Sequence, residues 1–269
     1  MLTGAPNFRD LGGLTTVDGH IIRSGVLFRS SGFEELTSAD VAYLVDEVGL
    51  RTVFDLRSHH DQEIAQPLAG MGVDVVNIPI ERDGAPTDIT RPMRPDGRVD
   101  IPLVYTMLLN TSVERFAEII HRLVSGATPA VFHCVSGKDR TGVMAAVLLE
   151  AVGVTRDQVI ADFMRTELLL DELVQQLYRR PAYAGIVDQL PPGTLDVEPW
   201  YIADFLAGVD AEHGSVRNWL MSRADVSAAT IDALVDLLVD TDDYSGRPPF
   251  SRQRLRPAPG AGEGNRDEL

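Results

Sequence analysis

The chain has 269 residues, of which 44% are hydrophobic, and it carries a formal net charge of −16. This length and apolar content are enough to bury a full core in one domain, and the acidic balance disfavours non-specific binding to nucleic acid or to anionic membranes. The single cysteine excludes an intramolecular disulfide and suits a reducing compartment.

The first residues of the sequence carry neither the basic stretch nor the apolar core of a signal peptide. No apolar run approaches the ~20 residues that a membrane-spanning helix needs. We therefore expect a cytoplasmic protein without stable membrane insertion, although export without a recognisable signal stays open. The terminal Arg-Asp-Glu-Leu resembles a retrieval signal of the endoplasmic reticulum and is interpreted as coincidence.

Strand and helix signals alternate along the first 80 residues. Thr37 is a good N-cap with Asp40 three positions later, and the apolar stripe that follows stops at Gly49. Strand-like composition is found at residues 20–30, 52–56 and 72–80. This order predicts a single α/β domain with a central, largely parallel β-sheet flanked by helices.

A polar turn follows the strand predicted at 52–56. Its charged residues Arg57, Asp61 and Glu63 are interpreted as a structural charge network. His59 and His60 are adjacent, so their side chains point apart, and no cysteine or third histidine is near. We therefore predict no metal site.

The second half of the chain is mainly helical in pattern. A polar loop rich in proline and glycine spans residues 81–100 and is long enough to suggest a functional role. Helices are predicted at 101–110, 112–124, 143–149, 155–165, 167–180 and 198–211, and from Ser227 onward. The leucine-rich stretch 167–180 is read most simply as a helix facing the core. Residues 241–269 show no periodicity and are predicted to be a disordered tail.

One short stretch carries the chemistry. The end of a buried strand, Ala130-Val131-Phe132, leads into a loop with Cys134 at its start and Arg140 six positions later, before an apolar helix. Backbone N–H groups of such a loop, backed by a helix N-terminus, bind anions and favour the thiolate form of a cysteine placed there. Arg140 can hold two phosphate oxygens at once. Together these groups describe a phosphoryl-transfer site with a covalent phosphocysteine intermediate.

The pattern His133-Cys134-x5-Arg140-Thr141-Gly142 resembles the signature loop of the cysteine-dependent phosphatases. With Gly137-Lys138-Asp139 inside the loop, it resembles a bacterial subgroup of tyrosine phosphatases whose loop is also similar to that of phosphoinositide phosphatases. Three more stretches match that subgroup, at residues 7–13, 28–31 and 55–58. The resemblance implies a protein-tyrosine-phosphatase-like fold, with a phosphatase domain over residues 1–240.

The resemblance also implies a role for each residue of the loop. Cys134 is the nucleophile, and the substrate phosphate is bound by the amides of Val135, Ser136, Gly137, Lys138, Asp139 and Arg140 together with the Arg140 side chain. Thr141 can donate a hydrogen bond to the cysteine sulfur, and His133 orients the loop through backbone bonds. Lys138 is expected to add positive charge at the mouth of the site, which suits substrates with more than one phosphate.

The general acid is less clear, because tyrosine phosphatases often carry it as Trp-Pro-Asp and this chain has no such sequence. Asp83, in the loop 81–100, and Asp139, in the signature loop, are the two candidates, with a slight preference for Asp139. Some relatives also possess a mobile helical lid, for which residues 166–192 are the candidate region. Arg9 and Asp10 either form a surface ion pair or belong to a segment that supports the active loop.

The function that these features favour is hydrolysis of phosphotyrosine in proteins, with a range that can extend to other phosphomonoesters. The alternative substrate is a phosphoinositide. A sulfurtransferase is disfavoured by the loop length, and an arsenate reductase by the single cysteine. A phosphate-binding module without turnover has no need of Cys134. No cofactor, metal or nucleic-acid partner is expected, and the oligomeric state is left open.

Overall fold

The computed structural model describes residues 2–58, 67–80 and 92–241. Its central sheet has five strands in the order β1-β3-β6-β4-β5, and all neighbours are parallel except β1 and β3. The strands are β1 (Arg9–Asp10), β3 (Leu27–Ser30), β6 (Ala130–His133), β4 (Thr52–Asp55) and β5 (Asp74–Asn77). A second, antiparallel pair joins β2 (Ile21–Ile22) to β7 (Val239–Asp240). The predicted α/β class with a largely parallel sheet is confirmed.

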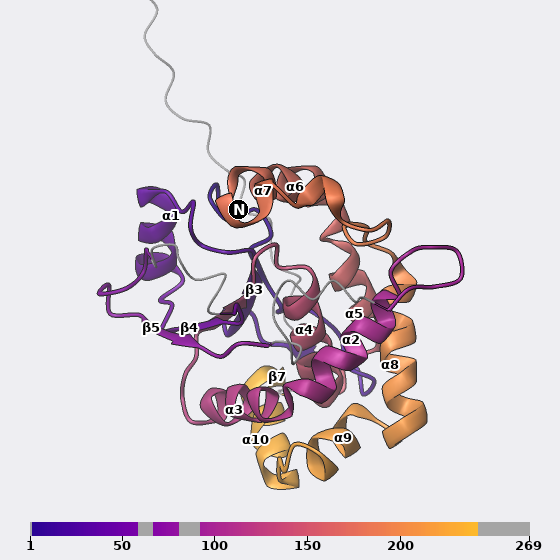
Figure 1. Ribbon diagram of the computed structural model, residues 1–269. Helices are drawn as coiled ribbons and strands as arrows, with labels where there is room; N and C mark the ends of the chain where they lie inside the picture. The colour runs from indigo at the N-terminus through magenta and orange to yellow at the C-terminus, as the bar shows by residue number, and fades with distance from the viewer. Residues whose placement is uncertain (1, 59–66, 81–91, 242–269) are drawn as a thin grey trace, which may run out of the picture.

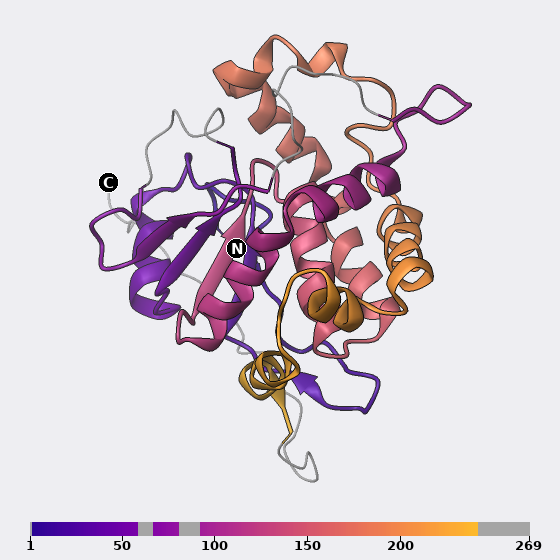
Figure 2. The same cartoon turned by 60° about the horizontal axis from the view of Figure 1, so that its bottom comes forward.

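Helices cover both faces of the sheet (Figures 1 and 2). They are α1 (Ser38–Ala42), α2 (Ile101–Thr111), α3 (Val113–Val124), α4 (Asp139–Ala151), α5 (Arg156–Met164), α6 (Leu170–Arg179), α7 (Pro181–Ala184), α8 (Pro199–His213), α9 (Val216–Ser222) and α10 (Ala228–Leu238). A π-helical turn, η1 (Tyr43–Glu47), continues α1. The predicted helices are confirmed, whereas α7 and α9 were not expected, and the strands in 20–30 and 72–80 are shorter than predicted.

The start of α1 follows the chemistry that its sequence predicts. The Thr37 hydroxyl accepts a hydrogen bond from the Asp40 amide at 3.1 Å, and the Asp40 carboxylate accepts one from the Thr37 amide at 2.9 Å. The same carboxylate accepts further bonds from the amides of Thr3 and Gly4, each at 2.9 Å. One acidic side chain therefore caps the helix and fixes the N-terminal segment against it.

The core lies on both sides of the sheet because successive strand residues face opposite ways. Phe132 of β6 and Phe54 of β4 belong to the larger apolar cluster, whereas Val131 and Val53 belong to the smaller one on the α1 side. Helix α4 is buried along almost its whole length, between the sheet and α2, α5, α8 and α9. This burial explains why its sequence is apolar on every side.

The parallel register aligns the polar ends of three strands. Ser30 of β3 and Asp55 of β4 both pair with His133 of β6, one on each side. Cys134 follows His133 directly, so the residues that end all three strands border one edge of the sheet. This is the edge at which parallel sheets place their ligands.

A helical segment lies over this edge, at the top of Figure 1. It comprises η3 (Glu167–Leu169), α6, α7 and η4 (Val187–Gln189). Leu177 of α6 and Val187 of η4 form a small apolar cluster with Val135, apart from the main core. Helix α6 therefore contacts the loop after β6 through Leu177, and the lid movement of residues 166–192 stays a prediction. The predicted tail, apart from residue 241, lies outside the described residues.

Among the residues that the structure describes, no helix combines the length and the apolar character needed to cross a bilayer.

Burial predicts how two identical substitutions differ. Leu148 of α4 is 0% exposed, so Leu148→Ala should lower the free energy of unfolding by about 2–5 kcal/mol, through lost apolar burial and the cavity left behind. Leu168 is 84% exposed, so Leu168→Ala should change it by no more than about 0.5 kcal/mol. Denaturant unfolding of both variants measures this, and equal losses would contradict the packing of α4.

Candidate active site

The loop between β6 and α4, residues 134–138, lies at the carboxyl edge of the parallel sheet. The Cys134 side chain at its start is buried and is the free thiol of the chain. Arg140 is the second residue of α4 and is half-buried. The structure therefore brings the predicted nucleophile and the predicted phosphate-binding arginine to the two ends of one loop.

Every carbonyl group of residues 134–138 accepts a hydrogen bond. The donors are His133 Nδ1 to Cys134 (3.0 Å), Gly32 N to Val135 (2.9 Å), Asn7 Nδ2 to Ser136 (3.0 Å), Arg29 Nη2 to Gly137 (2.8 Å) and Gly142 N to Lys138 (2.9 Å). These peptide bonds are trans, so each N–H points away from the carbonyl oxygen of its own peptide unit. The N–H groups of residues 135–139 are thus turned away from the donors, and they make no bond to another described residue.

Gly137 allows this path of the backbone. Its φ is +70°, in the left-handed region that favours glycine. A Cβ atom at this position would overlap the backbone oxygen of Ser30, which is the last residue of β3. The loop can therefore approach the neighbouring strand only with glycine here.

His133 is neutral and fixed. Burial, followed by the charge of Arg57, lowers the pKa of His133 to about 3. Its Nδ1 lies 3.0 Å from the Cys134 carbonyl oxygen, which can only accept, so the proton is on Nδ1. The ring also stacks on Phe33, with centroids 4.9 Å apart. This geometry agrees with the orienting role that we expected of His133.

Lys138 does not stand at the mouth of the site, and that prediction is wrong. Its side chain is buried, and its Nζ donates to the carbonyl oxygens of Thr194 at 2.7 Å and Asp196 at 2.9 Å. It also lies 3.5 Å from Asp139 Oδ1. An ammonium group has three donors, and three acceptors surround this one. Lys138 therefore connects the loop to the turn before α8.

Asp139, the first residue of α4, is held by a buried tyrosine. Tyr105 of α2 donates a hydrogen bond of 2.7 Å to Asp139 Oδ1. Burial, and then the charge of Asp139, raise the pKa of Tyr105 well above its ordinary value, so the phenol keeps its proton. The other candidate acid, Asp83, lies outside the described residues.

The hydroxyl of Thr141 is buried and has no hydrogen-bond partner among the described residues. The expected bond to the Cys134 sulfur is therefore not formed in this structure. Thr141 is the third residue of α4, within its first turn, and remains a candidate for that role.

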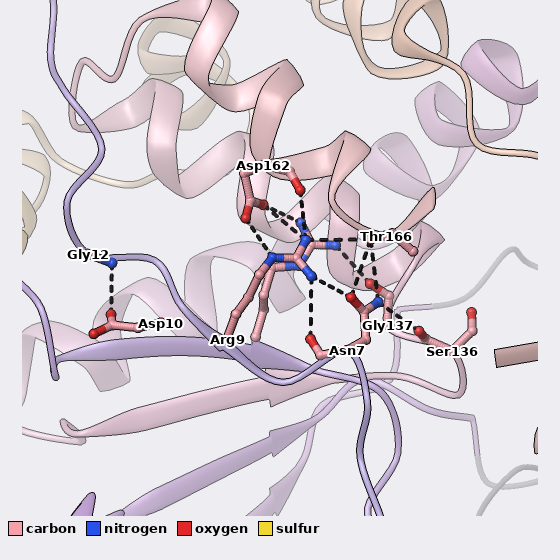
Figure 3. Close-up of polar contacts among 9 residues, drawn as sticks. Asn7, Arg9, Asp10, Gly12, Ser136, Gly137, Asp162 and Thr166 are labelled. Carbon is pink, nitrogen blue, oxygen red and sulfur yellow. Dashed lines mark hydrogen bonds and ion pairs between the residues drawn. The ribbon is translucent and has the colours of Figure 1, made fainter. Parts of the chain in front are cut away.

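The N-terminal motif supports the loop. Arg9 is buried and forms an ion pair with Asp162 of α5 at 2.7 Å, so the alternative of a surface pair with Asp10 is wrong. Asp10 instead accepts hydrogen bonds from the amides of Gly12 (2.7 Å) and Gly25 (2.8 Å), the first of which is drawn in Figure 3. The alternative in which residues 7–13 pack beside the active loop is confirmed by the bond from Asn7 to Ser136.

Arg57 joins a buried charge network, as predicted, and its partners in the described part of the chain are two acids. It pairs with Asp55 at 2.7 Å and with the buried Glu34, which also binds Arg180 at 2.6 Å. Asp61 and Glu63 lie outside the described residues, as do His59 and His60. Within the described ranges, no group of three or more His, Cys, Asp or Glu side chains could hold a metal ion.

Three residues near the loop were not found from the sequence. Asp162 and Tyr105 lie on the inner faces of helices whose apolar periodicity hides them, and Glu34 lies in an irregular segment. An acid or a phenol at a buried helical position indicates a functional contact only when its partner is known. The partners, Arg9, Asp139 and Arg57, are distant in sequence from these three.

A model described as the tyrosine phosphatase family matches residues 1–240. The triple specificity protein phosphatase PtpB of Mycobacterium tuberculosis is 30% identical over 88% of this chain and 98% of that protein. A protein of Cupriavidus necator named as a tyrosine-protein phosphatase is 28% identical over 84% of each chain. Among solved structures, Pseudomonas aeruginosa TpbA aligns over 76% of this chain and 91% of its own, at 17% identity and a TM-score of 0.35. A TM-score this low does not establish a shared fold.

The pKa of His133 predicts how stability depends on pH. The unfolded state takes up the proton near pH 6.5 and the folded state only near pH 3, so the contribution of His133 is present above 6.5 and is lost as the pH falls. The slope reaches at most ~1.4 kcal/mol per pH unit. Between pH 6.5 and 5, the unfolding free energy of the wild type should fall by roughly 1–2 kcal/mol more than that of His133→Gln. Parallel denaturant curves for the two proteins would contradict the buried neutral imidazole.

Proposed function

Because this chain belongs to the tyrosine phosphatase family, we propose that residues 1–240 hydrolyse phosphomonoesters through a phosphocysteine intermediate on Cys134. The observation that carries this proposal is the set of five carbonyls held outward around the loop that begins at a buried thiol. Amide groups turned to the other side match an anion with three equatorial oxygens. The relatives named as phosphatases support the reaction type.

In the first step the Cys134 thiolate attacks phosphorus and forms the S–P bond, while the bond between phosphorus and the leaving oxygen breaks. Arg140 and the loop amides bind the equatorial oxygens more tightly as charge redistributes in the transition state. In the second step water attacks the phosphocysteine, the S–P bond breaks, and inorganic phosphate leaves with the thiolate restored. No other co-reactant is needed.

Asp139 is the acid that we favour for the leaving oxygen. Tyr105 and Lys138 both approach its Oδ1, which leaves Oδ2 to carry and donate the proton. The same carboxylate would take a proton from the attacking water in the second step. Asp83 remains the competing candidate, and it would have to act from the segment 81–91.

Phosphotyrosine is the substrate that we favour, with a range that extends to other phosphomonoesters. The family description supports the first part, and the relative named as a triple specificity protein phosphatase supports the second. A cytoplasmic site of action suits a chain whose single cysteine has to stay a free thiol.

A phosphoinositide is the second candidate substrate. Its extra phosphates would need cations near the loop, and the buried Lys138 is already bonded to the carbonyls of Thr194 and Asp196. Rates on a panel of phosphotyrosine peptides, phosphoserine peptides and phosphoinositides separate these candidates. A phosphate-binding module without turnover predicts no rate on any of them.

Replacing the nucleophile tests the chemistry directly. Cys134→Ser should lower turnover to below about a hundredth of the wild-type value, because a serine hydroxyl is a far weaker nucleophile than a thiolate. Inorganic phosphate should still bind, since the loop amides are unchanged. Steady-state rates and phosphate titration check both parts, and substantial remaining turnover would rule out the thiolate mechanism.

Leaving-group chemistry identifies the acid. An aryl phosphate with a very acidic phenol departs without a proton, whereas an alkyl phosphate needs one. Asp139→Asn should therefore slow the alkyl phosphate by ~100-fold or more and spare the activated one, within the usual range of acid catalysis. Asp83→Asn is the matched variant and should show a weaker, uniform loss. The reverse pattern would assign the role to Asp83.

A further inference from the structure

Behind the signature loop lies a buried group of charges centred on Asp162. This carboxylate is 2% exposed; its Oδ1 lies 2.7 Å from Arg9 Nε and its Oδ2 lies 2.6 Å from Arg29 Nη1. The Asp162 carbonyl oxygen accepts a further bond of 2.8 Å from Arg9 Nη2. Figure 3 shows the contacts between Arg9 and Asp162.

The two arginines need this acid because of the strand register. Arg9 of β1 and Arg29 of β3 are direct cross-strand partners, and like charges in that position repel. Burial, and then Arg9, lower the pKa of Arg29 to about 10, and Asp162 opposes this shift. Burial alone would raise the pKa of Asp162, but the two arginines lower it, so the carboxylate is ionised. The group keeps a net charge of +1.

Both arginines are connected to the loop by hydrogen bonds, Arg29 directly and Arg9 through Asn7. Arg29 donates from Nη2 to the carbonyl oxygen of Gly137 at 2.8 Å. Arg9 donates from Nη1 to Asn7 Oδ1, which leaves the amide nitrogen of Asn7 to donate to the Ser136 carbonyl oxygen at 3.0 Å. The two chains of bonds start at one carboxylate and end at consecutive carbonyls of the loop (Figure 3).

We propose that Asp162 is a positioning residue of the phosphate pocket, which orients the amides of Gly137 and Lys138 through Arg29 and through Arg9 with Asn7. Those two N–H groups share peptide planes with the carbonyls of Ser136 and Gly137, so holding the oxygens outward turns the N–H groups toward the anion. Asp162 itself touches no reacting atom. The inference rests on the proposed function, because it needs the loop to bind phosphate.

The test uses the Cys134→Ser protein, in which inorganic phosphate can be titrated without turnover. Asp162→Asn keeps the shape of the side chain and removes its charge. It should raise the dissociation constant for phosphate at least ~10-fold, since two amide donors lose their orientation toward the anion. Asp210→Asn is the matched control, because Asp210 also pairs with an arginine of α5, Arg156 at 2.9 Å. It should change the constant less than twofold.

The midpoint of denaturant unfolding is measured for each protein, so that a loss of folding is separated from a loss of binding. A folded Asp162→Asn with unchanged phosphate affinity overturns the inference. Where Asp162→Asn does not fold, Asn7→Ala decides. It removes the side chain that donates to the Ser136 carbonyl oxygen and leaves the ion pairs of Asp162 in place. Unchanged affinity in a folded Asn7→Ala then overturns the inference. If the Cys134→Ser protein with Asp162 intact binds no phosphate, the proposed function itself fails, and the inference with it.

Discussion

The trans peptide unit is the constraint on which the candidate site depends. It fixes the carbonyl and the N–H of one plane in opposite directions, so a loop can present a row of amides only if its carbonyls are satisfied on the other side. Five carbonyls in succession are satisfied here by donors from residues 7, 29, 32, 133 and 142. The shape of the loop is therefore a product of the N-terminal segment, β3 and α4 together.

The charge around the loop is opposite in sign to the net charge of the chain. The chain carries a net charge of −16, yet the side chains of Arg9, Arg29 and Lys138 are buried around the loop. Burying a charge costs several kcal/mol per ion unless partners compensate it. The carboxylate of Asp162 neutralises only one of the two arginine charges. The remaining positive charge lies on the carbonyl side of the loop. An anion on the amide side gains from that excess.

The sequence predicted the features that repeat or lie close together in the chain. The 3.6-residue stripe of α3, the N-cap at Thr37 and the strand–loop–helix around Cys134 all follow from local patterns. Helices α7 and α9 were missed because segments of four and seven residues give at most two turns of periodicity.

Those local patterns could not predict which residues distant in sequence would pair. Arg9 has Asp10 next to it in sequence, but its partner is Asp162, because α5 brings that carboxylate over the β1–β3 pair. Lys138 was expected near the mouth because it lies in the signature loop. Its ammonium turns inward because an irregular turn, without a periodic signal, presents the carbonyls of Thr194 and Asp196.

Support of the loop and access to it come from different parts of the fold. The bonds to the Ser136 and Gly137 carbonyls start from Asn7 and Arg29, whereas Val135 packs on Leu177 and Val187 of the helical segment. Lifting that segment would expose a small apolar cluster, at about 1–3 kcal/mol for each side chain, and would separate the buried pair of Arg180 and Glu34. Neither loss removes a donor to those two carbonyls. If the helical segment moves as predicted, access to the pocket would change while Asn7 and Arg29 still donate to the Ser136 and Gly137 carbonyls.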